Sequence, residues 1–273
     1  MAKLPKDINT AVHLIDHKEY LSKKPRGYLG MSSIGGECER KAWYGFRWVH
    51  LDGHHLARTE RIFQVGHYYE GEMIEHLESI GVEFITRQEE FVSCHGHMKG
   101  HSDGKIIKLP EAPKAEHVFE AKTHNQKSFE SVVKKGVEKS KPVHYAQMQE
   151  YMKHSGCKRA YYLAYNKNTS EYYSERVKYD ADYTEDLERK AFSIVFSDQP
   201  PEKKFSPSYY ACKSYPCKYY DVCHKGFTDI TKTCRTCIHV DVANEGRWVC
   251  EKKNKNLTYD EQLAGCGDYG SII

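Results

Sequence analysis

The sequence has few long apolar stretches. No run of hydrophobic residues approaches the length of a membrane-spanning helix. The first residues, MAKLPKDINTAVHLIDHK, lack the apolar centre of a secretion signal. We therefore expect a protein that makes no membrane contact and stays in a reducing cytoplasm.

The chain also lacks a strong net charge, internal repeats and low-complexity segments. Its 41 Lys and Arg residues nearly balance 38 Asp and Glu, which leaves a formal charge of +3. Such a balance excludes a global basic field, so any surface for nucleic acid must be local. The 273 residues can form one sizeable domain with an appendage, or two small domains.

Cysteine, in contrast, is plentiful and unevenly placed. Six of the ten cysteines lie between Cys212 and Cys250, and Cys266 follows closely. In a reducing compartment, clustered thiols are typical of metal sites rather than of disulfides. The C-terminal quarter is therefore predicted to bind metal.

Helical and strand-like segments alternate along the first 200 residues. Helices are expected over 7–23, 35–48, 58–80, 128–135, 142–154 and 181–197. Strands are expected over 82–92, 97–109, 116–123, 159–166 and 171–179, with the last two forming a hairpin. The alternation predicts an α/β fold in which helices flank a mixed sheet.

The strand EHVFEAKT, over 116–123, contains the most unusual residues. Side chains alternate along a strand, so Glu120 and Lys122 share one face while Phe119 and Ala121 share the other. Asp103, in the segment GHSDG, is expected in a tight glycine-flanked turn. Two carboxylates and an ammonium can then converge, and carboxylate oxygens suit Mg²⁺ or Mn²⁺.

A third carboxylate can join them from the long helix expected over 58–80. Glu70 lies at the edge of its apolar stripe, four residues after Gly66, where a missing side chain leaves room. Glu70 can equally be a boundary glutamate, and His67 is the alternative ligand. The stripe itself is formed by Ile62, Val65, Tyr69, Met73, Leu77 and Ile80.

A later helix, opened by Pro142, places Gln147 and Tyr151 four residues apart on one face. Such a pair can line a site. In the plainer interpretation, Tyr151 is a core aromatic and Gln147 a surface residue.

The order G-x-x-x-E, Asp, E-x-K and Q-x-x-x-Y resembles the PD-(D/E)XK nuclease superfamily, and within it the RecB-like exonuclease branch. The resemblance covers roughly residues 30–225 and implies a restriction-endonuclease-like core. It implies that Mg²⁺ or Mn²⁺ is held by Glu70, Asp103, Glu120 and the carbonyl of Ala121. Lys122 would then act on the attacking water, while Gln147 and Tyr151 would position the DNA strand.

Three thiols just past this core carry a second resemblance. Cys212, Cys217 and Cys223 need a fourth ligand, for which the chain offers Cys38, Cys94 or Cys157. A lone early cysteine with a late trio resembles the iron–sulfur staple of RecB-family nucleases, which implies a 4Fe–4S cluster on Cys38, Cys212, Cys217 and Cys223. The C-x₄-C spacing departs from the family's commoner C-x₂-C, and structural zinc remains the alternative. Cys38 can also be an ordinary buried cysteine.

The last four cysteines form a second set, namely Cys234, Cys237, Cys250 and Cys266. One C-x₂-C pair with two spaced thiols is typical of a Cys₄ zinc site, although His239 can replace one thiol. We expect a nuclease core over 1–225 and a small metal-bound, zinc-ribbon-like tail over 226–273. Cys94 and Cys157 are expected to be buried or free.

Taken with the resemblance, these features predict a metal-dependent deoxyribonuclease. It would be an exonuclease on single strands or duplex ends in replication or recombination, of a phage-encoded type and therefore active in the host cytoplasm. The alternative is a non-catalytic nucleic-acid-binding protein, or a replication-assembly protein that docks through the zinc tail.

Overall fold

The computed structural model describes the chain except for residues 1–10, 12–14, 16–23, 52–56, 214–216 and 228. The helix expected over 7–23 lies almost wholly outside the described residues. Among the helices that are described, none has the length and apolar character to cross a membrane.

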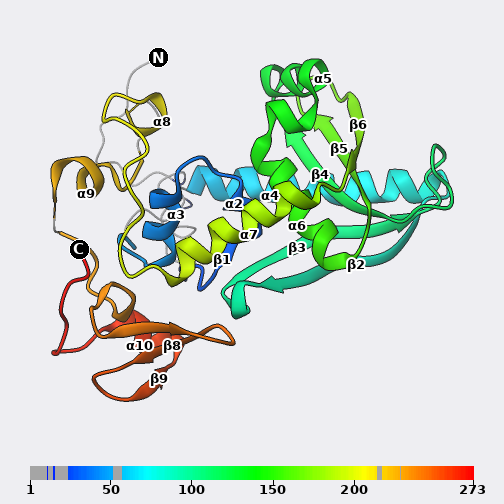
Figure 1. Cartoon of the computed structure of the whole chain (residues 1–273). Coiled ribbons are helices and arrows are strands. Elements are labelled where there is room, and N and C mark those ends of the chain that lie inside the picture. The colour runs from blue at the N-terminus through cyan, green and yellow to red at the C-terminus, as the bar shows by residue number, and fades with distance from the viewer. Residues whose placement is uncertain (1–10, 12–14, 16–23, 52–56, 214–216, 228) are drawn as a thin grey trace, which may run out of the picture.

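A mixed six-stranded sheet forms the centre of the molecule (Figure 1). Its order is β1-β3-β4-β5-β6, with β2 also paired to β3, and the β1–β3 and β4–β5 pairs are parallel. The strands are β1 (Leu29–Gly30), β2 (Glu83–Ser93), β3 (Met98–Ile107), β4 (His117–His124), β5 (Arg159–Asn166) and β6 (Tyr172–Lys178). The five strands predicted from the sequence are all present, and only the two-residue β1 was not expected.

Helices cover both faces of this sheet, namely α2 (Met31–Ile34), α3 (Glu39–Phe46), α4 (Ala57–Ser79), α5 (Gln126–Ser140), α6 (Pro142–Ser155) and α7 (Ala181–Phe196). Two short helices, α8 (Tyr210–Lys213) and α9 (Tyr220–Lys225), lie beyond α3 and away from the sheet in Figure 1. Pro142 occupies the first turn of α6, as predicted, where a missing N–H leaves no helix hydrogen bond unmade. Asn125 and Asp180 cap α5 and α7 through their side chains.

Alternation along β5 divides the core into two layers. Tyr162 packs into the large cluster that contains residues of α2, α3, α6 and α7. Tyr161 and Leu163, on the other face, pack with Met73 and Leu77 of α4. The predicted α/β class, a mixed sheet flanked by helices, is confirmed.

The apolar stripe of α4 holds for only half of the helix. Met73 and Leu77 are buried, whereas Ile62, Val65 and Ile80 are at least 40% exposed. The predicted stripe is therefore buried only around Met73 and Leu77, where the sheet lies under α4; Ile62 and Val65 precede that part of the helix, and Ile80 follows its last residue.

The turn expected at Asp103 is also absent. Asp103 lies inside β3, which is paired with β2 on one side and β4 on the other. The glycines on either side of Asp103 form no turn; they allow the Tyr151 ring and the backbone of β2 to lie close to β3. A Cβ at Gly100 would lie 2.7 Å from the Tyr151 ring, and one at Gly104 would lie 2.9 Å from the carbonyl oxygen of Thr86.

The last forty residues form a separate small sheet of three antiparallel strands, below α3 and far from α5 in Figure 1. It consists of β7 (Val240–Ala243), β8 (Arg247–Cys250) and β9 (Lys255–Leu257). A single turn, η2 (Cys234–Thr236), precedes it, and α10 (Tyr259–Ala264) follows. We call this small sheet, with η2 and α10, the ribbon; that it is a metal-bound, zinc-ribbon-like tail stays a prediction.

This ribbon is packed against the core through Arg235. The guanidinium donates hydrogen bonds of 2.9 Å to the Phe46 carbonyl and 2.8 Å to the Gly27 carbonyl. It also lies 3.7 Å from the ring centroid of Trp48 and 4.3 Å from that of Trp248. The division at residues 225 and 226 stays a prediction, and the two parts share one hydrophobic cluster.

Candidate metal-ion and strand-cleavage site

The site is built where β3 runs beside β4. The backbone N–H of Ala121 donates a 2.7 Å hydrogen bond to Oδ2 of Asp103, which fixes that carboxylate against β4. Glu120 and Lys122 project together from β4, and the Lys122 ammonium donates to Oε1 of Glu120. The structure thus brings together the two carboxylates and the ammonium that the sequence singled out.

Glu120 is fully buried and only partly satisfied. Its Oε2 atom has no hydrogen-bond partner among the described residues. Burial raises the pKa of Glu120 to about 8, opposed by Lys122 and reinforced by Asp103 and Glu70. A buried carboxylate oxygen without a partner is unfavourable by about 1–3 kcal/mol, and a cation bound there would remove that penalty. The donor set fits a hard divalent ion.

The same field acts on Asp103 and Lys122. Burial raises the pKa of Asp103, and Lys122 opposes that rise. Burial also lowers the pKa of Lys122, but the nearby charges of Glu120 and Asp103 outweigh it and leave the pKa above its usual value. Lys122 is therefore a cation, held next to two carboxylates.

Glu70 approaches the site from α4. Its Oε1 accepts a 2.6 Å hydrogen bond from Gln88 of β2, and its Oε2 lies 3.6 Å from Nδ1 of His67. Burial raises its pKa, and the next cause is the charge of Asp103. The side chain of Glu70 is 16% exposed and that of His67 is 79% exposed. Glu70 is the more buried of the two candidates, while the charge of His67 acts on Asp103 and that of Glu70 acts on Glu120, so the choice of Glu70 as the third ligand stays a prediction.

We expect Glu70→Gln to raise the Mg²⁺ or Mn²⁺ concentration needed for half-maximal activity by about tenfold, because an amide cannot neutralise the ion. His67→Ala should change it little, because that ring points to solvent. Metal titrations of the two variants, at a fixed substrate concentration, compare them directly. A larger effect from His67→Ala would place the third ligand elsewhere on α4.

Gln147 and Tyr151 lie beside this cluster on α6. The Gln147 amide donates a 3.0 Å hydrogen bond to the Tyr151 hydroxyl, and both side chains are buried. Burial and then the charge of Glu120 raise the pKa of Tyr151, which keeps its hydroxyl neutral. The ring is backed by Phe91 at 5.6 Å between centroids. A buried amide–hydroxyl pair therefore borders the carboxylates.

One group at this site was not predicted. His124 continues the alternation of Glu120 and Lys122, and its Nε2 lies 2.8 Å from the Tyr162 hydroxyl. The same hydroxyl lies 3.0 Å from Nδ1 of His144. Burial, with Lys122 as a further cause, lowers the pKa of His124 to about 4 and that of His144 to about 2. Two neutral imidazoles thus contact the hydroxyl of Tyr162, which is paired with Glu120 across β4 and β5. His124 could have been predicted, because the two-residue period of the strand places it on the same face as Glu120 and Lys122.

The first cysteine set gathers around the start of α3. Cys38 is the N-cap residue, and its sulfur accepts the N–H of Lys41 at 3.4 Å. Burial raises the pKa of Cys212, and the next causes are the nearby thiols of Cys217, Cys38 and Cys223. The charges of the four predicted ligands thus act on one another, but among the described residues no three of their sulfur atoms all lie within 4.8 Å of one another, so a 4Fe–4S cluster or zinc on this set stays a prediction. Cys94 and Cys157 are buried.

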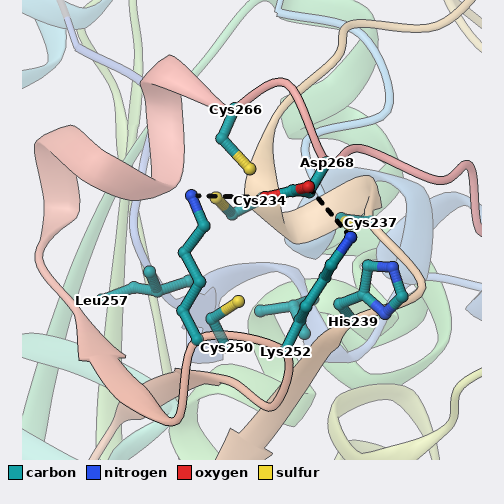
Figure 2. A pocket seen from close by; sticks show the side chains of 10 residues that line it. Cys234, Cys237, His239, Cys250, Lys252, Leu257, Cys266 and Asp268 are labelled. Carbon is teal, nitrogen blue, oxygen red and sulfur yellow. Dashed lines mark hydrogen bonds and ion pairs between the residues drawn. The ribbon is translucent and has the colours of Figure 1, made fainter.

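The second set lines one pocket of the ribbon (Figure 2). Its thiols are those of Cys234, Cys237, Cys250 and Cys266. The ring of His239 lies at the edge of the pocket, and the ammonium groups of Lys252 and Lys253 bridge to Asp268 across it. The four thiols line one pocket, but among the described residues no three of their sulfur atoms all lie within 4.8 Å of one another, so a Cys₄ zinc site stays a prediction.

Comparisons with known proteins add a weak likeness of fold. No family model matches the chain, and no curated protein matches it. An alkaline exonuclease, LHK-Exo from Laribacter hongkongensis, is similar over 66% of this chain and 90% of its own, with 14% identity and a TM-score of 0.44. The structure of LHK-Exo in complex with dAMP is similar over 67% of this chain and 90% of its own, with 14% identity and a TM-score of 0.47. SSO0001 is similar over 80% of this chain and 98% of its own, with 15% identity and a TM-score of 0.46. At these scores the likeness is slight, and the chemistry of the site has to be judged from its own residues.

Proposed function

We propose that the protein is a Mg²⁺- or Mn²⁺-dependent deoxyribonuclease, and specifically an exonuclease on single strands or duplex ends. The observation that carries the proposal is the convergence of Asp103, Glu120 and Lys122 on adjacent strands, with one buried oxygen of Glu120 unpartnered among the described residues. Such a site has the charge and the donors for phosphodiester hydrolysis.

Asp103, Glu120 and Glu70 would hold the ion or ions, with the carbonyl of Ala121 as a further ligand. When bound, Mg²⁺ or Mn²⁺ would polarise the phosphate and lower the pKa of the attacking water. Burial raises the pKa of each of the three carboxyl groups, and the charge of Asp103 adds to that rise at Glu70 and Glu120. Bound cation and ionised carboxylates therefore stabilise each other.

The remaining residues would act on the water and on the strand. Lys122, charged and hydrogen-bonded to Glu120, can orient the attacking water and offset negative charge that develops on the phosphate. Gln147 and Tyr151 form one neutral donor–acceptor pair at the edge of the carboxylates, suited to hold a strand in place.

Digestion of end-labelled linear and of circular single-stranded DNA tests the proposal. With Mg²⁺ or Mn²⁺, the linear substrate should be shortened to small products while the circle survives, and chelator should stop the reaction. Cleavage of the circle would make the enzyme an endonuclease. Binding of DNA without cleavage of any substrate would favour the non-catalytic alternative and reject the enzyme.

We further infer that the two cysteine sets hold different metals. Cys38 and the trio Cys212, Cys217 and Cys223 join the first helices to the segment after the sheet, where a 4Fe–4S cluster would act as a staple. Cys234, Cys237, Cys250 and Cys266 line a single small pocket, as structural zinc requires. A reducing cytoplasm would keep all of these thiols available.

Anaerobically purified protein should therefore be brown and contain both iron and zinc. Cys217→Ser should lose the colour and the iron, because one cluster ligand is gone, and Cys250→Ser should lose zinc and keep the colour. Metal analysis and visible absorption of both variants make the comparison. Colourless wild-type protein with zinc in both cysteine sets would reject the iron–sulfur cluster and indicate a second zinc site.

A further inference from the structure

A second cluster of metal-ligand residues lies between α6 and α7, away from the carboxylates of the proposed nuclease site. It contains Glu150 and His154 of α6 and Glu188 of α7, and the ligand atoms of the three lie within 4.8 Å of one another. Nε2 of His154 is 3.5 Å from Oε2 of Glu150 and 3.6 Å from Oε1 of Glu188. Glu150 and His154 are one helical turn apart, so the pairing follows from the helix.

Glu150 is the unusual member of this cluster. Its side chain is 0% exposed, and neither carboxylate oxygen has a hydrogen-bond partner among the described residues. Nε2 of His154, 3.5 Å from Oε2 of Glu150, is also without a hydrogen bond among the described residues. A fully buried carboxylate next to an unpaired imidazole nitrogen is unfavourable unless a proton or a metal ion lies between the two groups.

Glu188, the third member of the cluster, already accepts two hydrogen bonds. Oε1 of Glu188 accepts a 3.1 Å hydrogen bond from the Ser93 hydroxyl, and its Oε2 accepts one from the Lys153 ammonium. The His154 ring lies nearly parallel to the ring of Phe91, at 6.4 Å between centroids. Serine and phenylalanine thus fix Glu188 and His154 in place. Two carboxylates against one ammonium leave a negative charge for a cation to neutralise.

We propose that Glu150, His154 and Glu188 form a binding site for a divalent transition ion, with Zn²⁺ as its best occupant. Zn²⁺ binds imidazole nitrogen and carboxylate oxygen at about 2.0–2.2 Å, so tetrahedral ligands lie about 3.3–3.5 Å apart. The observed separations of 3.5 and 3.6 Å are close to that value. An imidazole ligand disfavours Mg²⁺, which prefers oxygen and water.

The site is reachable and its position has a structural consequence. The side chains of His154 and Glu188 are 20% and 26% exposed, so an ion can enter on their side while Glu150 forms the floor. A bound ion would cross-link α6 to α7. Because α6 also carries Gln147 and Tyr151, the ion would hold that pair in position.

Zinc content separates this site from the others. The full-length protein is treated with a mild chelator, then titrated with Zn²⁺ in excess Mg²⁺, which occupies the oxygen site. His154→Gln should bind about one zinc equivalent less than wild type, whereas the control Glu185→Gln, an exposed carboxylate on the same α7, should match wild type. Zinc held by cysteines is common to all three proteins and cancels. Zinc should also raise the Tm of wild type by more than that of His154→Gln.

Zinc-edge anomalous scattering from wild-type crystals provides a second measurement that needs no variant to fold. A peak among Glu150, His154 and Glu188 is expected. Equal zinc contents in wild type and His154→Gln, or crystals with no peak there at saturating Zn²⁺, would overturn the proposal and leave a buried Glu–His pair that shares a proton. Either result is independent of DNA cleavage.

Discussion

Lys122→Met, Glu120→Gln and Asp103→Asn should each reduce the rate of DNA cleavage by about 10²–10³-fold or more, with the fold retained. Each substitution keeps the approximate shape of the side chain and removes its charge. Loss of a charged group that acts only at the reacting phosphate is worth on the order of 10²–10³ in rate, and loss of a metal ligand at least as much. Single-turnover cleavage of a labelled oligonucleotide measures the effect.

Double variants give a sharper comparison than single ones. Because the three residues act as a unit, Asp103→Asn combined with Lys122→Met should be little slower than either alone. Lys127→Met is a matched control, because Lys127 is exposed on α5 and lies only five residues after Lys122. Turnover near the wild-type rate in any of the three single variants would show that the reaction occurs elsewhere.

Arg235→Ala should have the largest effect on stability and lower the free energy of unfolding by about 3 kcal/mol. Burial lowers the pKa of Arg235 to about 9, so the buried cation opposes folding to some extent. Its removal would nonetheless leave the carbonyls of Phe46 and Gly27 and the amide oxygen of Gln262 without their donor. It would also open a cavity between two indole rings. The stabilisation lost with these contacts is expected to be larger than the stabilisation gained because a cation is no longer buried.

Chemical denaturation of Arg235→Ala and of a matched variant tests whether the loss of Arg235 lowers the free energy of unfolding. Arg247→Ala is suitable because Arg247 lies on the same ribbon with a side chain that is 47% exposed. That control should change stability by no more than about 0.5 kcal/mol. Arg235→Ala protein as stable as wild type would mean that the ribbon is attached to the core by other contacts.

The parts of the site that lie on one element were predictable. A strand period of two places Glu120 and Lys122 on one face, and a helical period places Gln147 next to Tyr151, as the structure shows. The same period would also have found His124. These relations depend only on local geometry, so the order of residues is enough.

Relations between elements were harder to predict. Asp103 was expected in a turn because glycines flank it, but those glycines make room for Tyr151 and for β2, which are remote in sequence. The exposure of Ile62 and Val65 depends on where the sheet ends beneath α4. Glu188 meets Glu150 only through the packing of α6 on α7. No local pattern contains such information.

The binding of a divalent ion by the central carboxylates can be tested most directly in crystals soaked with Mn²⁺. Anomalous scattering should show a manganese peak between Asp103 and Glu120, within bonding distance of the oxygen of Glu120 that has no partner among the described residues. The peak should vanish in Glu120→Gln crystals. A well-ordered site with no manganese at saturating concentration, in protein that still cleaves DNA, would contradict the assignment of these residues as the metal centre.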